Sequence, residues 1–187
     1  ARWRTLERDL SPWTAHNRGV NGATFKELLP RFAADPEKTA PEAIIIYAGE
    51  NDIAAGGTAQ QAIDNLTLFL DDKSRKFGDT PTFVVSMKPS PTRWNNFAEQ
   101  SRFNAAARAL AARRGDLSYV DIVPQLLVDG RPGDFYVDDG IHMNEAGYRL
   151  WASAIRQSLD QALSDGKMRQ CDPVFSSPAA PQTATRN

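Results

Sequence analysis

Runs of apolar residues alternate along this chain with stretches in which apolar side chains recur every three or four positions. Continuous apolar runs are typical of strands covered on both faces, whereas the longer spacing is typical of helices with one buried side. The runs predict strands at 43–48, 82–87 and 117–123, and a shorter, more polar strand is predicted at 15–20. The spaced stretches predict helices at 1–10, 24–32, 58–70 and 95–114, and from 144 onward.

This alternation of strand and helix predicts an α/β fold, a three-layer α/β/α domain around a mostly parallel sheet. Two predicted helices begin with capping boxes, Thr24 with Glu27 and Thr58 with Gln61, and Asn144 is a good N-cap for the last helix. We expect residues 44–47 and 83–85 to be deeply buried in adjacent parallel strands.

Length and composition indicate one domain. Residues 1–166 are long enough to bury a core, and the Ser-, Pro-, Ala- and Thr-rich segment 167–187 is predicted to be a disordered or loosely attached tail. The net charge of -1 argues against nucleic acid as a partner. There is no apolar run of about 18 residues, so no membrane insertion is expected. Cys171 is the only cysteine, which excludes an internal disulfide bond.

Four loops follow the predicted strands, at 21–22, 49–52, 88–91 and 139–142. Ligands of parallel α/β sheets bind at the carboxyl ends of the strands, so these loops are expected to meet at one edge of the sheet. The last of them contains Asp139 and His142 on either side of Gly140. A carboxylate there can orient the imidazole as a general base, although the same pattern also fits a capping loop with a surface histidine.

Two other loops contain candidate donors for an oxyanion. Gly22 directly precedes a helix, where backbone N–H groups are unsatisfied, and Asn51 has a side-chain amide after a buried strand. Each also has an ordinary structural interpretation, a turn glycine and an Asx-turn. Asp52 is expected to hold its loop in place rather than to react.

Taken in order, the segments NRGVNGAT, YAGEND and DGIH resemble the second, third and fifth conserved blocks of the SGNH hydrolases, also called the GDSL esterase family. The segment KPSPTR is similar to a loop of lysophospholipase-like and acetylesterase-like bacterial members. The resemblance implies a flavodoxin-like domain that hydrolyses small-molecule acyl esters without metal or cofactor. It places Gly22 and Asn51 in the oxyanion hole and makes Asp139 and His142 the acid and base of a Ser-His-Asp triad.

The family's first block, which carries the nucleophilic serine on a central strand, has no match in this chain. The opening ARWRTL resembles the segment that follows that block, which implies a serine a few residues before Ala1 and a chain that lacks this N-terminal piece. Among the serines present, Ser11 ends a helix and Ser86 lies inside a strand. Only Ser90 lies in a loop at the expected edge, and a turn serine between two prolines is the favoured interpretation.

The predicted function is therefore serine-dependent hydrolysis of acyl esters. The alternative is a catalytically inactive, ligand-binding domain of the same fold. A metal site at Asp138, Asp139, His142 and Glu145 is less favoured, because hydrolytic zinc sites usually use two or three nitrogen or sulfur ligands. A nucleotide-binding domain is weaker still, since both G-x-G-x-x-G and a Walker lysine loop are missing.

Two further expectations concern aromatic and histidine side chains. His16 is interpreted as structural. Four aromatic residues are candidates for the wall of an acyl pocket, although ordinary packing explains them equally well: Trp94, Phe97, Phe135 and Tyr136.

Overall fold

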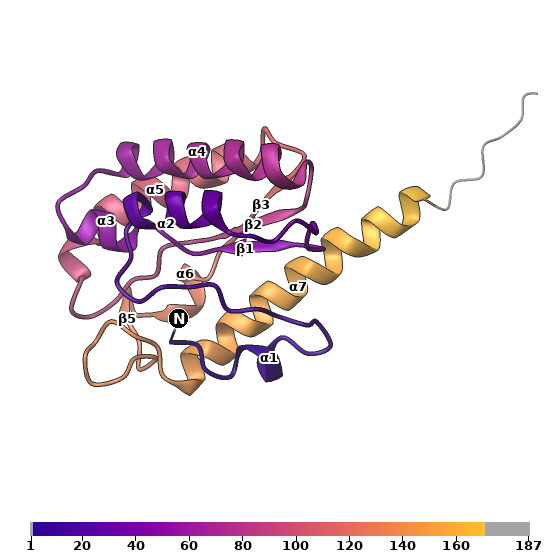
Figure 1. The fold of residues 1–187 in the computed structure, drawn as a ribbon. Coiled ribbons are helices and arrows are strands. Elements are labelled where there is room, and N and C mark those ends of the chain that lie inside the picture. Colours follow the sequence, from indigo (N-terminus) through magenta and orange to yellow (C-terminus); the bar gives the residue numbers. More distant parts are fainter. Residues whose placement is uncertain (1, 171–187) are drawn as a thin grey trace, which may run out of the picture.

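The computed structural model describes residues 2–170, and its centre is a parallel sheet of three strands (Figure 1). The strands are β1 (Ile44–Ile46), β2 (Thr82–Val85) and β3 (Leu117–Val120), in the order β1-β2-β3. Ile45 lies opposite Phe83, and Phe83 lies opposite Ser118. The prediction of adjacent parallel strands is therefore confirmed.

Helices cover both faces of the sheet, which confirms the three-layer α/β/α architecture (Figure 1). One layer contains α2 (Phe25–Ala34), α4 (Ala59–Phe77) and α5 (Phe97–Ala111). The long helix α7 (Glu145–Gln170) and the short α1 (Leu6–Asp9) form the other. None of the described helices is long and apolar enough to span a membrane.

Short elements lie in the loops that connect these layers. They are α3 (Glu50–Ala54), the 3-10 helix η1 (Trp94–Asn96), α6 (Val123–Leu126), and a hairpin of β4 (Leu127–Val128) and β5 (Arg131–Pro132). All are shorter than a hydrophobic period can reveal, and the sequence patterns predicted none of them as a separate element.

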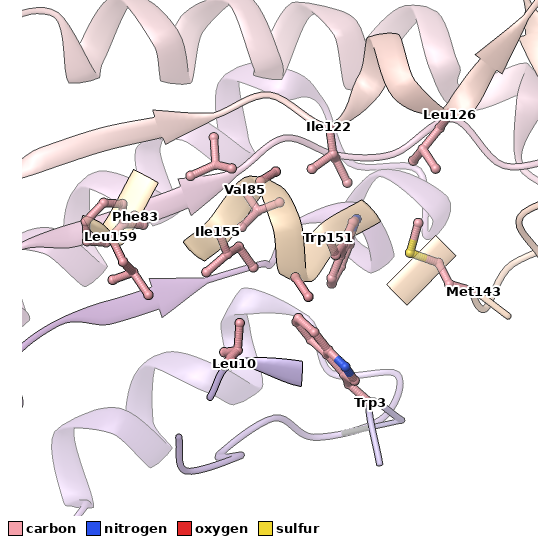
Figure 2. Packing of buried hydrophobic residues seen from close by; sticks show 13 residues of the cluster. Trp3, Leu10, Phe83, Val85, Ile122, Leu126, Met143, Trp151, Ile155 and Leu159 are labelled. Atoms are coloured by element: carbon pink, nitrogen blue, oxygen red, sulfur yellow. The ribbon is translucent and has the colours of Figure 1, made fainter. Parts of the chain in front are cut away.

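The two faces of the sheet have separate cores, because successive side chains of a strand point in opposite directions. Phe83 and Val85 pack with Trp151 and Ile155 of α7, as Figure 2 shows. Val84, between them in the chain, belongs to the opposite cluster with α4 and α5. Alternate residues of one short strand thus hold both helical layers.

The predicted strand at 15–20 is wrong. Within residues 2–170 this segment has no strand partner, and residues 16–20 are exposed, His16 among them. A strand needs a neighbour to satisfy its backbone groups, and in this described part of the chain only β2 pairs with β1.

The expected deep burial of residues 44–47 is also wrong in part. Ile46 is buried, but 37% of Ile45 is exposed. Ile45 lies on an edge strand and points to the face of α7, whose contacts with the sheet centre on β3. The consecutive apolar residues of β1 therefore do not mark a strand covered on both sides.

The described ends of the chain also differ from the predicted boundaries. The first helix is limited to Leu6–Asp9, and α7 continues to Gln170, past the predicted domain limit at 166. The remainder of the predicted tail, 171–187, lies outside the described residues.

Candidate active site

Asp139 and His142 form a hydrogen-bonded pair on a tight loop just before α7. Asp139 Oδ2 lies 2.7 Å from His142 Nδ1, which is the predicted contact. Asp139 Oδ1 accepts the backbone N–H groups of Ile141 (2.8 Å) and His142 (2.9 Å). Each carboxylate oxygen therefore has its own partners, and His142 Nε2 is the ring nitrogen left to meet another group.

These bonds also fix the charge of the pair. The backbone N–H and imidazole of His142, followed by the N–H of Ile141, hold the pKa of the Asp139 carboxyl well below its usual value. Asp139 thus remains an anion over the whole range in which a histidine changes its protonation state.

The backbone around the pair closes on itself. Val137 donates its N–H to the carbonyl oxygen of His142 (2.9 Å), and Gly140 donates its N–H to the carbonyl oxygen of Val137 (2.8 Å). Gly140 has a φ of 63°, and a Cβ at this position would lie 2.5 Å from Thr92 Oγ1. Asn144 accepts the N–H of Gly147 (3.0 Å), so it caps α7 as predicted. A glycine turn and a helix cap therefore set the position of His142.

Asn51 lies in the first turn of α3, after the left-handed Gly49 (φ 91°). Its Nδ2 donates to the carbonyl oxygen of Ala23 (3.0 Å), and its Oδ1 accepts from Arg93 Nη1 (3.0 Å). Ala23 follows Gly22 directly, so the structure brings the two predicted oxyanion donors to adjacent positions. Gly22 is exposed in a turn with a φ of 73°.

Asp52 holds the same two segments together, as its interpretation as a loop-fixing residue requires. Both of its carboxylate oxygens accept the backbone N–H of Phe25, each at 3.1 Å. That N–H is in the first turn of α2, where helices leave such donors unsatisfied. The successive residues Asn51 and Asp52 therefore both bind the entry to α2, one through a carbonyl and the other through an N–H.

Thr92 and Arg93 connect the two halves of the site. Thr92 Oγ1 donates to the carbonyl oxygen of Asp139 (2.7 Å). The backbone N–H of Thr92 donates to the carbonyl oxygen of Gly140 (3.2 Å). The next residue, Arg93, binds Asn51. One dipeptide therefore joins the loop of Asp139 and His142 to Asn51, the predicted oxyanion donor.

A buried charge cluster lies behind Asn51. Glu50 Oε1 accepts from Arg93 (3.1 Å), and Glu50 Oε2 accepts from Lys88 (2.7 Å) and from the hydroxyl of Tyr47. Glu50 and Lys88 are each only 5% exposed. Burial opposes the charge of Glu50, but Lys88 and the hydrogen bonds outweigh it and lower the pKa of its carboxyl. One carboxylate thus faces two cations, which leaves a net positive charge beside Asn51.

With this geometry established, the chain can be compared with known proteins. Residues 1–150 match the model of the GDSL-like lipase/acylhydrolase family. The chain belongs to this family. No curated protein is similar enough to be counted as a relative.

Solved structures of low sequence identity share the fold of this GDSL-like chain. One is described as a platelet activating factor from Streptococcus pneumonia, with a TM-score of 0.75 and 22% identity over 84% of this chain and 78% of that chain. A second is a carbohydrate esterase family 3 protein from Talaromyces cellulolyticus, with a TM-score of 0.69 and 20% identity over 82% of this chain and 74% of that chain. A third is a serine-to-alanine mutant of an acetyl esterase with acetate ion, with a TM-score of 0.67 and 20% identity over 83% of this chain and 78% of that chain.

None of the three serines considered for a nucleophile in this GDSL-like chain is in a suitable place. Ser86 is buried, and its Oγ accepts the N–H of Ile122 (3.0 Å). Ser90 is at the expected edge, but its side chain is completely buried. Ser11 lies next to Pro12, in a shallow cleft against α7 that the site residues do not line.

The other candidate groups do not assemble as sites. Trp94 and Phe97 stack at 4.8 Å, whereas Phe135 and Tyr136 pack against the core on the side of α7. Within residues 2–170, no three His, Cys, Asp or Glu side chains are grouped so that they could hold a metal ion. Glu145, from the alternative metal set, instead pairs with Arg149 at 3.1 Å.

Proposed function

We propose that this chain contributes the base, the acid and the oxyanion donors of a serine ester hydrolase. His142 takes the proton of a serine hydroxyl as that oxygen attacks the ester carbonyl, and then passes it to the leaving alcohol. Asp139 orients the imidazole and stabilises its protonated form. Asn51 and Gly22 donate hydrogen bonds to the negative oxygen of the tetrahedral intermediate.

The observation that carries this proposal is the contact between Asp139 and His142. The 2.7 Å bond places the carboxylate on Nδ1, so Nε2 is the atom that faces a nucleophile. Two backbone N–H groups hold the other carboxylate oxygen, so the pair has little freedom to turn away. A histidine that only belonged to a capping loop would not need a carboxylate bound to its ring nitrogen.

The nucleophile in this proposal is a serine outside the 187 residues. Two observations support it. Ser90 at the sheet edge and Ser86 directly after β2 are buried, and within the described residues β1 is paired on one side only. Because Ile44 donates its N–H towards β2, to Pro81 (2.9 Å), the peptide groups of Ile45 point to the open side. A further strand at this edge would end next to the loop that contains Asn51.

Acyl esters of small alcohols are the proposed substrates, with acetyl esters and lysophospholipids as the first to test. Family membership supports an acyl ester in general. The acetyl esterase of the same fold makes acetyl groups the natural starting point.

Hydrolysis of p-nitrophenyl acetate by the full-length natural polypeptide tests the proposal. We expect His142→Ala to lower kcat by at least about 10³-fold, because the serine then has no base. Asn51→Ala should lower kcat by about 10²- to 10³-fold, the usual effect of one lost oxyanion donor. His16→Ala removes the other histidine of the chain at an exposed position, is the matched control, and should leave kcat unchanged.

Two outcomes would contradict the proposal. Equal activity of the His142→Ala variant and the unmodified polypeptide would remove the histidine from the reaction. A full-length polypeptide that hydrolyses neither acetyl esters nor lysophospholipids, yet binds them, would instead favour the inactive ligand-binding domain.

A further inference from the structure

We infer that Arg93 is a positioning residue that sets the direction of the Asn51 amide, so that one of its N–H groups is available to an oxyanion. The inference rests on the proposed function for the role of Asn51. The contact itself is a property of the structure, and it can be tested without any catalysis.

The two partners of the Asn51 amide determine which way it faces. A guanidinium can only donate hydrogen bonds, so the amide atom next to Arg93 must be the oxygen. A backbone carbonyl can only accept, so the atom next to Ala23 must be the nitrogen. A flipped amide would lose both bonds.

This orientation leaves one donor free. Asn51 Nδ2 has two hydrogens, and Ala23 takes one of them. The other has no partner among the described residues, so it can bind the developing negative charge of a substrate. Without Arg93, the amide could turn its oxygen to that position, where it would repel an oxyanion.

Arg93 is itself held in place by the buried carboxylate of Glu50. Its Nη1 also donates to Glu50 Oε1 (3.1 Å), and Lys88 occupies the other oxygen of Glu50 (2.7 Å). The side chain of Arg93 is only 20% exposed, so water weakens these contacts little. The guanidinium therefore has a fixed position before it reaches Asn51.

The charge of Arg93 adds to its effect on geometry. A cation bound to the oxygen of an amide draws electron density from the nitrogen and makes its N–H a stronger donor. Removal of Arg93 still leaves the buried pair of Glu50 and Lys88 balanced, so the fold should survive the substitution. Loss of function and loss of structure can therefore be separated.

A double-mutant cycle in the full-length polypeptide tests the inference. We expect Arg93→Ala to lower kcat for p-nitrophenyl acetate by about 10- to 100-fold, with KM changed less than about 2-fold. Because Arg93 acts through Asn51, the double variant Arg93→Ala/Asn51→Ala should be no slower than Asn51→Ala alone. Arg93→Lys should restore only part of kcat, since an ammonium keeps the charge but lacks the rigid plane that fixes the directions of the two N–H groups of Nη1. Losses that multiply in the double variant would show that Arg93 acts on its own, and would overturn the inference.

A second measurement does not depend on activity. In the full-length polypeptide, the NMR signals of the Asn51 side-chain amide should shift in Arg93→Ala, and the contact between that amide and Ala23 should weaken. Arg75→Ala is the matched control, because Arg75 is 71% exposed on α4 and pairs with Asp72. An Asn51 amide that is unchanged in Arg93→Ala would overturn the inference, even in a polypeptide that hydrolyses no ester. A shifted amide in an inert polypeptide would keep the positioning contact and refute only the proposed function.

Discussion

At the scale of single residues, the site depends on a glycine where a side chain would meet both backbone strain and close neighbours. Gly49 has a φ of 91°, and a Cβ there would lie 2.5 Å from Met87 Cε and 3.1 Å from the ring of Phe25. This glycine ends the segment after β1 and starts α3, so it sets the direction in which Asn51 leaves the sheet.

The cost of a side chain at Gly49 can be separated into backbone strain and packing. Gly56 has nearly the same φ, 92°, but nothing lies within 4 Å of the place that a Cβ would take there. We expect Gly56→Ala to lower the free energy of unfolding by about 1 kcal/mol, from backbone strain alone. Gly49→Ala should lower it by about 3 kcal/mol, because the core must also move. Urea denaturation of both variants measures the difference, and equal losses would show that the core around Met87 yields freely.

Single residues also show what the sequence could predict about the site. The contact between Asp139 and His142 was predictable because the partners are three positions apart across a glycine, so local geometry decides it. The contact of Arg93 with Asn51 joins residues 42 positions apart. It depends on how two loops lie across the sheet edge, and no spacing rule contains that information. The segment KPSPTR, which includes Arg93, stands out in the sequence only as part of a resemblance.

At the scale of elements, the sequence predicted the long helices correctly, because their hydrophobic pattern extends over several turns. It failed for one predicted strand, because a strand forms only beside a neighbouring strand. Helices α4, α5 and α7 have enough turns to show their periodicity, and the N-terminal caps of α4 and α7, at Thr58 and Asn144, are local signals. The segment at 15–20 has strand-like residues but no partner in the described chain, so it forms no strand. The free edge of β1 likewise has no neighbouring strand among the described residues. Because no described strand covers that edge, Ile45 is partly exposed.

A buried ion pair joins the end of α4 to the start of β3. Lys73 is fully buried, and its Nζ contacts Asp116 Oδ2 (2.6 Å) and the carbonyl oxygens of Gly78 (3.0 Å) and Thr80 (3.1 Å). Arg114 also binds Asp116 through two nitrogens, each at 2.9 Å. The hydrogen bond from Arg114, with those from Lys73, holds the pKa of Asp116 well below its usual value, although burial opposes this.

We expect Asp116→Asn to lower the free energy of unfolding by about 3 kcal/mol at neutral pH, because Lys73 is left as a buried charge without a counter-ion. The folded-state pKa of Asp116 is lower than the unfolded value, so its contribution is complete above the ordinary carboxyl pKa of 3.8 and is lost as the pH falls further. The difference between Asp116→Asn and the unmodified chain should therefore shrink below about pH 4. Asp160→Asn, at an exposed position on α7, is the control. A difference that stays constant down to pH 2 would contradict this account of the ion pair.

At the scale of the whole molecule, the two helical layers form a scaffold, and the site is made of loops from one edge of the sheet. The loops come after β1, after β2 and before α7, and Thr92 and Arg93 tie them together. The described residues therefore contain the proposed base, its carboxylate partner and the proposed oxyanion donors in one connected network. They do not place a serine hydroxyl within that network.

The central claim is that this network serves a serine outside the 187 residues. Mass spectrometry of the full-length polypeptide after reaction with a fluorophosphonate tests it most directly, because this reagent bonds to a serine that an adjacent histidine has activated. We predict a single adduct, on a serine outside the 187 residues, and its loss in His142→Ala. An adduct on Ser90 or on any other serine of this chain, or no adduct at all, would contradict the account.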